Sequence, residues 1–437
     1  MMKKILPFLI ILIYLSDNAL CQPEISPQIQ GLMEELISET EDDSEISVIY
    51  EHLEAVLQNP YEINSVSKEE LESLFIITDF QIYTFLEYRE KYGRILSLKE
   101  LYLIIGFNPD IIEQLKAFVV VGNEASSSMP THSKRYSDFK ILNRYVKSTP
   151  AKNGFLEEAD SLTAFSGNNY SRLFKLQYKF GDNFSTGLTM ESDAGEALRF
   201  DKYTNGFDFY SAYFQLQRPD KIVNNFIVGD FRLSSGLGLI HGYGFSSKSS
   251  ESLIKQKFTQ IKRFTSTAES GFYRGLAIKS SLLNFESILY FSRNNQSANL
   301  KTDENDDVFF SSIDISGLHR NLSEQIHKNS IIEQNSGFIL SRINNASRFS
   351  YQANLTQFER ALQYRKYPDR YSELKNTNKF FNQSVSYNKL LSKFNMSGEF
   401  ALDKNYNLAI QQIINAYLHP LLSMSLSYRY FSPRYIS

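Results

Sequence analysis

The chain has 437 residues, of which 42% are hydrophobic and 14% aromatic, and its formal net charge at pH 7 is -3. A mean hydropathy of -0.31 argues against a bundle of membrane-spanning helices. The same value permits a membrane protein built from strands, because such a protein has a polar inner face. A chain of this length exceeds one compact core, so two or more structural units are expected.

The N-terminus has the pattern of an export signal. Lys3 and Lys4 precede an apolar run, Ile5 to Leu15. At about eleven residues the run is too short to cross roughly 30 Å of hydrocarbon. A cleaved secretory signal is therefore predicted over residues 1–21. Cys21 is the only cysteine of the chain. The bulky Leu20 before it favours cleavage after Cys21 over the alternative, which is lipid attachment to Cys21.

Charge is segregated along the chain. Residues 22–60 contain ten acidic and no basic side chains, and residues 61–121 contain ten acidic and six basic ones. Residues 122–437 contain 28 acidic and 38 basic side chains. Such segregation indicates separate modules with different surroundings. The spacing of apolar residues predicts an acidic helical segment at 22–60, with candidate buried positions at Leu32, Leu36, Ile46, Ile49, Leu53 and Leu57.

Two similar helical units are predicted between residues 61 and 121. Ser67–Leu71 is echoed about thirty residues later by Ser97–Leu101, and in each the serine can cap a helix while a glutamate reaches back to it. Each box leads through a short turn, at 76–78 or 106–108, into a second helix. These helices are expected at Asp79 to Lys91 and at Pro109 to Phe118, with Gly93 suited to a helix C-terminus.

The segments Glu62–Ser65 and Tyr88–Gly93, the box at Ser67 and the turn at Gly106 resemble the tandem helix-hairpin-helix module of competence DNA receptors. The whole chain is similar to the exported helix-hairpin-helix proteins of Bacteroidetes-type bacteria, in which a strand-rich region follows the module. The resemblance implies an all-α module over residues 61–121. It also implies contacts from backbone N–H groups to DNA phosphates beside a helix N-terminus.

The candidate nucleic-acid-binding residues are the two hairpin turns: Ile76, Ile77, Thr78, Gly106, Phe107 and Asn108. The family pattern has glycines where this chain has Ile76, Thr78 and Asn108. Neither turn contains Lys or Arg, and ten acidic against six basic residues give the module a net charge of about -4, which opposes binding to a polyanion. A helical module that packs on or docks to a protein is therefore favoured over one that binds DNA.

After a small and polar linker at 122–136, alternation of apolar and polar residues dominates residues 137–437. Every second residue from Leu422 to Tyr430 is apolar or aromatic, and Phe174 to Phe180 has the same pattern. Because successive side chains of a strand point to opposite faces, each segment has one apolar and one polar face. Further strands are expected at Phe207–Gln217, Asn225–Leu233, Gly236–Tyr243, Leu276–Lys279, Phe285–Arg293, Phe338–Arg342, Phe349–Phe358 and Met396–Leu402.

Several of these segments have the nine to eleven residues that a tilted strand needs to cross a bilayer. Short turns such as Gly181–Asn183 alternate with longer polar insertions at Ser246–Thr267, Asn294–Asp307 and Ala361–Asn378, a habit of membrane barrels. The predicted fold class is α+β multidomain, with a small all-α tandem helix-hairpin-helix module followed by an antiparallel transmembrane β-barrel of about twelve to sixteen strands. A soluble β-sandwich is the alternative. The barrel is favoured by 27 Tyr and 34 Phe, and it can be incomplete as the sequence stands.

The sequence has no phosphate-binding loop, no paired cysteines and no His-x-x-x-His spacing, so no metal, no cofactor and no catalytic residue are expected. His241, within the glycine-dense Gly238–Gly244, is the one histidine considered for a barrel hydrolase, although strand bending is the favoured role of this stretch. The segment Asp230–Arg232 is expected to form an inward-facing ion pair of structural use.

Together these features predict a non-enzymatic outer-membrane β-barrel protein for transport or surface attachment, with its helical module in the periplasm. Its expected partners are outer-membrane lipid and, through the module, DNA or a periplasmic protein. The basic excess of residues 122–437 would favour anions in a lumen or lipid phosphates at a rim. The alternative is a DNA-binding protein of the competence or DNA-uptake type.

Overall fold

The computed structural model describes residues 53, 56–57, 60–66, 70–71, 74, 76–77, 79–122, 137–147, 149–150, 152–155, 164–181, 183–200, 205–218, 221–242, 260–302, 306–344, 346–363, 377–391, 393–419 and 422–436. The predicted signal, nearly all of the acidic segment 22–60 and nearly all of the linker 122–136 lie outside the described residues. Within the described ranges, no helix combines the length and the apolar composition needed to cross a membrane.

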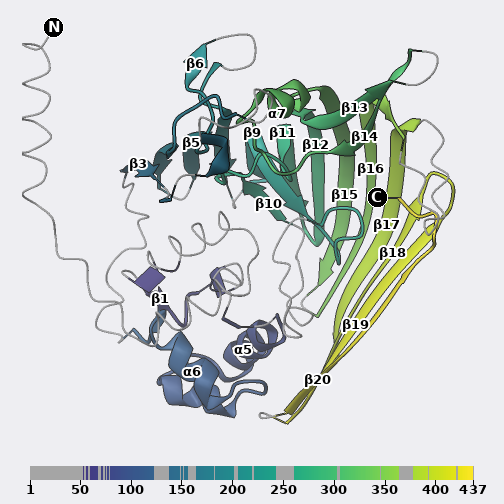
Figure 1. Ribbon diagram of the computed structural model, residues 1–437. Helices are drawn as coiled ribbons and strands as arrows, with labels where there is room; N and C mark the ends of the chain where they lie inside the picture. The colour runs from purple at the N-terminus through teal and green to yellow at the C-terminus, as the bar shows by residue number, and fades with distance from the viewer. Residues whose placement is uncertain are drawn as a thin grey trace, which may run out of the picture.

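The N-terminal module is a small helical unit with its own core (Figure 1). Its elements are β1 (Tyr61–Glu62), α5 (Asp79–Tyr92), η3 (Leu98–Leu103, a 3-10 helix), α6 (Pro109–Leu115) and β2 (Val119–Val120). Strands β1 and β2 pair in parallel and join the two ends of the module. The helix predicted from Asp79 is present, and the one predicted from Pro109 ends at Leu115 rather than Phe118.

Capping determines where these helices begin and end. The predicted box at Ser97 is confirmed: Ser97 Oγ accepts a bond from Lys99 N, and Glu100 Oε1 accepts one from Ser97 N. The helix that follows is a 3-10 helix. Gly93 follows α5 with φ of +86°, a conformation that side chains other than glycine rarely adopt. The box predicted at Ser67 lies outside the described residues.

The remaining strands form one large sheet and a two-stranded ladder, β6 (Arg199–Phe200) with β7 (Asn205–Gly206). The large sheet holds sixteen strands in the part of the chain that is described. They are β3 (Ser137–Val146), β4 (Ser171–Phe180), β5 (Phe184–Ser192), β8 (Phe209–Gln217), β9 (Val223–Ser234), β10 (Gln260–Arg263), β11 (Tyr273–Leu282), β12 (Phe285–Gln296), β13 (Ala298–Thr302), β14 (Val308–Ile313), β15 (Ile331–Asn344), β16 (Ser347–Leu362), β17 (Thr377–Leu391), β18 (Phe394–Asp403), β19 (Leu408–His419) and β20 (Leu422–Phe431).

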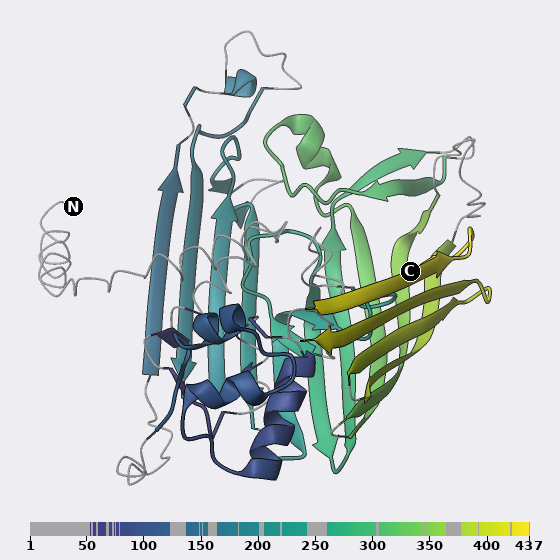
Figure 2. The ribbon, with the colours of Figure 1, turned by 90° about the horizontal axis from the view of Figure 1, so that it is seen from below.

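Neighbours along the sheet run antiparallel in the order β20-β19-β18-β17-β16-β15-β12-β11-β9-β8-β5-β4-β3, and Figures 1 and 2 show the sheet curled rather than flat. The strands joined by 181–183, 218–222, 283–284, 345–346, 392–393 and 420–421 meet at one end of the sheet, the short-turn end. The strands joined by 147–170, 193–208, 235–272, 297–330, 363–376 and 404–407 meet at the opposite end, the loop end. This agrees with the predicted division into short turns and long loops, with the four-residue connection 404–407 as the exception.

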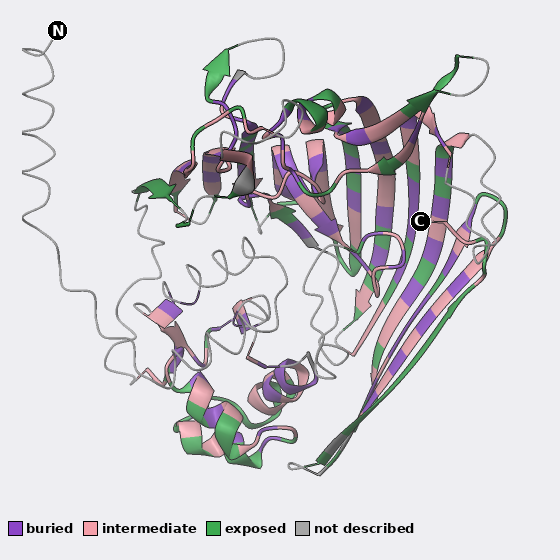
Figure 3. Cartoon of the chain, viewed as in Figure 1, coloured by how far each residue is buried: buried purple, intermediate pink, exposed green. Residues whose placement is uncertain are grey.

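The two faces of the sheet differ sharply in chemistry. Leu340, Tyr351, Val385 and Phe400 are register partners across β15 to β18, and all four are exposed. The adjacent row on the opposite face, Ser341, Ser350, Ser386 and Glu399, is buried. Figure 3 shows the resulting bands along each strand. We call the apolar exposed face the outer face and the polar face the inner face.

Residues 235–242, after β9, form an inner segment that packs on the inner face. The backbone N–H groups of Leu237 and Leu239 donate to Glu399 Oε2 at 2.7 and 3.1 Å. Gln352 and Ser384 donate to the other oxygen, Oε1. The strand predicted at Gly236–Tyr243 was wrong, because Gly236 and Gly238 take positive φ and turn the chain inward.

Two predicted loops were also wrong in part. β12 continues to Gln296 and β13 follows at once, so most of Asn294–Asp307 that is described is strand. The described parts of Ala361–Asn378 include the end of β16 and the start of β17. Polar residues misled the prediction here, because β12 ends in Asn294, Asn295 and Gln296 and β17 begins with Thr377 and Asn378.

The sheet is not closed among the described residues. β3 pairs with β4 alone, and β20 pairs with β19 alone. Both edge strands begin at the short-turn end and finish at the loop end, so they run in the same direction.

Candidate functional site

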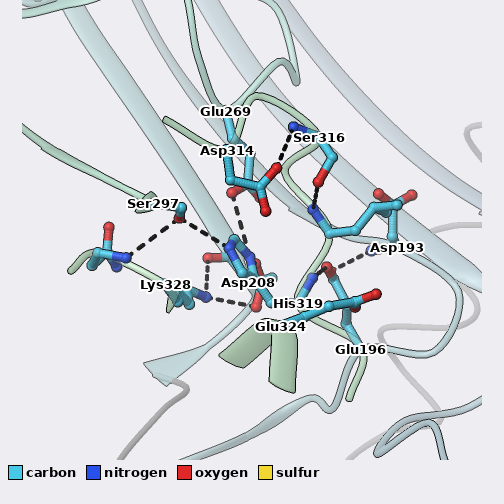
Figure 4. Close-up of polar contacts among 12 residues, drawn as sticks. Asp193, Glu196, Asp208, Glu269, Ser297, Asp314, Ser316, His319, Glu324 and Lys328 are labelled. Atoms are coloured by element: carbon cyan, nitrogen blue, oxygen red, sulfur yellow. Dashed lines mark hydrogen bonds and ion pairs between the residues drawn. The ribbon is translucent and has the colours of Figure 1, made fainter. Parts of the chain in front are cut away.

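Five buried or largely buried ionisable side chains meet at the loop end of the sheet (Figure 4). Glu196 follows β5, Asp208 precedes β8 and Glu269 precedes β11. His319 precedes α7 (Leu322–His327), and Lys328 follows it. We call these five residues the loop-end cluster. It joins connections that lie far apart in the sequence, so it fixes the loop end as one unit.

His319 is held through both ring nitrogens. Its Nδ1 lies 2.7 Å from Asp208 Oδ2, and its Nε2 lies 3.0 Å from Ser297 Oγ. Because a carboxylate oxygen accepts, Nδ1 donates to Asp208, and Nε2 of a neutral ring then accepts from the serine hydroxyl. Lys328 Nζ donates to Asp208 Oδ1 at 2.6 Å and to its carbonyl oxygen at 2.9 Å.

The charges of the three carboxyl groups are set by their surroundings. Burial would raise the pKa of Asp208, but the hydrogen bond from His319 and the ammonium of Lys328 lower it below its usual value. Burial and the charge of Asp208 raise the pKa of Glu196 to about 8. Burial, Asp208 and Glu196 raise the pKa of Glu269 to about 10, so Glu269 is a neutral acid at pH 7.

The donor set resembles that of a metal centre, since one ligand-type atom each from Glu196, Asp208 and His319 lie within 4.8 Å of one another. These atoms already have partners in the protein. The two oxygens of Glu196 accept from the backbone N–H groups of His319 and Asp193. Lys328 supplies a cation to Asp208. The arrangement therefore fits a hydrogen-bonded network better than a metal site.

We expect the Glu269→Gln variant to lose part of the pH dependence of stability. With a folded pKa of about 10 against an ordinary 4.5, Glu269 stabilises the fold fully below about pH 4.5. That contribution is lost as pH rises through about 10. Glutamine does not ionise, so the variant should gain thermal stability over the wild type between pH 5 and pH 10. The exposed Glu113→Gln is the matched control. If the difference in thermal stability between Glu269→Gln and the wild type were the same at pH 5 and pH 10, the assignment would be contradicted.

The predicted turn at 106–108 exists, and local packing accounts for its residues. Gly106 has φ of +95°, and a Cβ there would lie 3.0 Å from Phe80. Its carbonyl accepts from Gln81 Nε2 at 2.7 Å. Asn108 Oδ1 caps α6 by accepting from Ile111 N at 2.8 Å.

The other predicted binding residues are less available. Phe107 and Ile77 are buried in the module core, and Ile76 packs against it. Thr78 lies outside the described residues. Among the described residues of the two turns, only backbone groups and the half-buried Asn108 could therefore meet a phosphate, and DNA binding there stays a prediction.

His241 does not lie in a catalytic setting. It is fully buried, with Nδ1 3.2 Å from Tyr273 Oη and Nε2 3.1 Å from Tyr290 Oη. Tyr290 in turn donates to Asn354 Oδ1. These neighbours are tyrosines with no carboxylate, so His241 ties the inner segment to the wall.

The ion pair predicted within Asp230–Arg232 was wrong in its partner. Asp230 accepts from Arg274 Nε at 2.7 Å, a pairing across β9 and β11. The Asp230 side chain is buried. Sequence neighbours were favoured as partners only because cross-strand register was not known.

No protein-family model matches this chain, and no curated protein does so either. Among solved structures it is similar to an anion-selective porin from Comamonas acidovorans, at 10% identity and a TM-score of 0.25 over 64% of this chain and 83% of that one. It is also similar to Salmonella typhi OmpF in complex with daunomycin, at 8% identity and a TM-score of 0.27 over 68% and 91%. An OmpT variant of Vibrio cholerae lacking loop L8 gives 10% identity and 0.25 over 68% and 93%. At these TM-scores the likeness carries nothing about function.

Proposed function

We propose that the chain is an outer-membrane β-barrel protein whose wall lines a passage for polar solutes and whose N-terminal module docks to a periplasmic partner. The observation that carries the proposal is the reversed polarity of the sheet. Its exposed face is apolar, and its buried face is rich in polar side chains.

The exposed fractions of individual side chains show how far the polarity of the two faces is reversed. Leu289 is 58% exposed and Val385 50%, while Gln352 and Glu399 are 0% exposed. A soluble protein rarely exposes a continuous apolar patch of this extent, because apolar surface in water is unfavourable. Lipid chains around the outer face remove that cost, and an antiparallel wall satisfies its own backbone. The soluble sandwich weighed from the sequence does not account for a buried face of this polarity.

The outer face also carries a shallow groove of about 470 Å3 lined by apolar side chains of β11, β12, β15, β16 and β17. Leu276, Leu289, Phe338 and Phe381 are among its lining residues. An open furrow of hydrocarbon side chains suits lipid acyl chains, which pack along a barrel wall without a specific polar contact.

The topology supports a periplasmic place for the N-terminal module. β3 is the first strand of the sheet and begins at the short-turn end. In bacterial barrels the short turns face the periplasm and the long loops face outside. The linker 122–136 would therefore leave the barrel on the periplasmic side. There the tandem helix-hairpin-helix module, proposed on the resemblance described above, would act as a docking element.

Cell fractionation of the full-length protein tests the location. We expect it in the outer-membrane fraction, and we expect a compact species in detergent whose gel mobility shifts on heating. Recovery in the soluble periplasm, or a mobility indifferent to heating, would contradict the proposal.

For the competence-type alternative, we expect the isolated fragment 53–122 not to shift duplex DNA at low salt. The fragment contains the whole module core, so it can be tested alone. Its acidic excess opposes a polyanion. A salt-dependent shift that is lost in Asn108→Ala, with the exposed Glu113→Ala as control, would favour DNA binding instead.

A further inference from the structure

We propose that Ser297, His319 and Asp208 form a nucleophile, base and orienting acid that hydrolyse carboxylic esters at the loop end of the sheet. No feature of the sequence singled out these residues. The proposal does not depend on the barrel function, since the three side chains belong to loops beyond the strands.

The distances and directions match what a serine nucleophile needs. Ser297 Oγ lies 3.0 Å from His319 Nε2, and His319 Nδ1 lies 2.7 Å from Asp208 Oδ2. Asp208 and His319 are buried, whereas Ser297 is partly exposed. A buried acid and base behind an accessible hydroxyl is the arrangement that activates serine. Figure 4 shows His319 lying between Ser297 and Asp208.

A backbone donor stands beside the nucleophile. The N–H of Asn329 points at Ser297 Oγ at 3.4 Å, and Asn329 has φ of +49°, which is uncommon for a residue other than glycine. Ser330 Oγ accepts from Ala298 N at 3.0 Å and donates to Ala298 O at 3.1 Å. This double contact fixes Asn329 against Ser297, so its N–H can meet an oxygen on the carbon attached to Oγ.

The rest of the loop-end cluster positions the base. Glu196 Oε1 accepts from the backbone N–H of His319 at 2.9 Å. Lys328 orients Asp208 through its other oxygen. Because Glu269 is neutral at pH 7, Asp208 is the one carboxylate of this group that presents a full charge to Nδ1. These contacts favour one tautomer and one ring orientation of His319.

The reaction balances with water alone. Ser297 Oγ forms a bond to the ester carbonyl carbon as its proton passes to His319 Nε2. The bond from that carbon to the alkoxy oxygen breaks, and Nε2–H gives the proton to the departing alcohol. Water then attacks the acyl group and gives a proton to Nε2. The bond to Oγ breaks, and Ser297 recovers its proton. The products are one acid and one alcohol.

The substrate class follows from the donor count. The described contacts place one backbone N–H beside Oγ, so an oxyanion there receives modest stabilisation. Esters need less of it than amides, because an ester carbonyl is more electrophilic and an alkoxide leaves more readily than an amide anion. Partial exposure of Ser297 favours small acyl groups over bulky ones.

The first experiment treats the folded full-length protein in detergent with a fluorophosphonate, which labels activated serines, and maps the modified residue by mass spectrometry. We expect labelling at Ser297 that disappears in Ser297→Ala and persists in Ser312→Ala, an exposed serine on the neighbouring β14. Absence of label on Ser297 in the folded wild type would overturn the proposal, as would equal labelling of Ser312.

The second experiment measures turnover of p-nitrophenyl acetate. Asp208→Asn should reduce the rate by about 10,000-fold, because an orienting amide holds the wrong imidazole tautomer. Heat-dependent gel mobility shows whether each variant is folded. If Asp208→Asn does not fold, Ser297→Ala tests the same proposal, because it removes only one oxygen atom. Turnover unchanged in folded Ser297→Ala would overturn the assignment, while the membrane location would be untouched by that result.

Discussion

Val385→Arg should destabilise the folded, lipid-inserted protein by about 2–4 kcal/mol, the cost of an arginine near the bilayer midplane on a barrel wall. Val385 lies midway along β17 on the outer face, half exposed, with Tyr351 and Phe400 as its register partners. If acyl chains surround this face, the guanidinium loses its water on insertion. If water surrounds it, an exposed strand position tolerates arginine with little change.

The measurement is urea unfolding of the refolded protein in lipid vesicles. Val385→Leu is the matched control, because it keeps the site apolar at a similar size. The same arginine placed at Lys389, four residues along the strand toward the short turn and exposed, should cost less. Equal stability of Val385→Arg and Val385→Leu would show that the outer face does not contact lipid.

Glu399→Ala should release the inner segment and raise the single-channel conductance of the reconstituted protein. Four groups donate to this one buried carboxylate: the backbone N–H groups of Leu237 and Leu239, and the side chains of Gln352 and Ser384. Hydrogen bonds to charged groups contribute about 1.5–3 kcal/mol each, so loss of the shared acceptor should favour displacement of residues 235–242.

Planar-bilayer recordings of the wild type and the variant provide the measurement. Ser341→Ala is the control, since Ser341 is a buried inner-face residue whose partner is Ser350 rather than the inner segment. Identical conductance in Glu399→Ala and wild type, with the control unchanged as well, would show that the inner segment does not limit passage.

The strands were predictable to the extent that their pattern is local. Period-two alternation is written into each segment, so β4, β8, β9 and β20 were expected within a few residues of their observed bounds. Gly236–Tyr243 failed because a glycine-rich apolar run fits both a strand and an inward loop. Two positive-φ glycines decide between them, and only tertiary contact with Glu399 reveals that choice.

The loop-end cluster could not be predicted from the sequence. Asp208 and His319 are 111 residues apart, and their pairing depends on the connections before β8 and before α7 meeting at one end of the sheet. His241 drew attention instead, since glycines flank it, and it proved to be a histidine satisfied by two tyrosines. Strand register and loop packing bring these residues together, and neither produces a periodic pattern in the amino-acid sequence.

The shared direction of β3 and β20 constrains how a seam in this wall can be sealed. Direct pairing of β20 with β3 would create a parallel ladder, whereas neighbours along the order from β20 to β3 are all antiparallel. Closure through additional antiparallel strands instead needs an odd number of them, because each added strand reverses direction. Whether zero or an odd number of strands is added therefore distinguishes the two ways of closing the barrel.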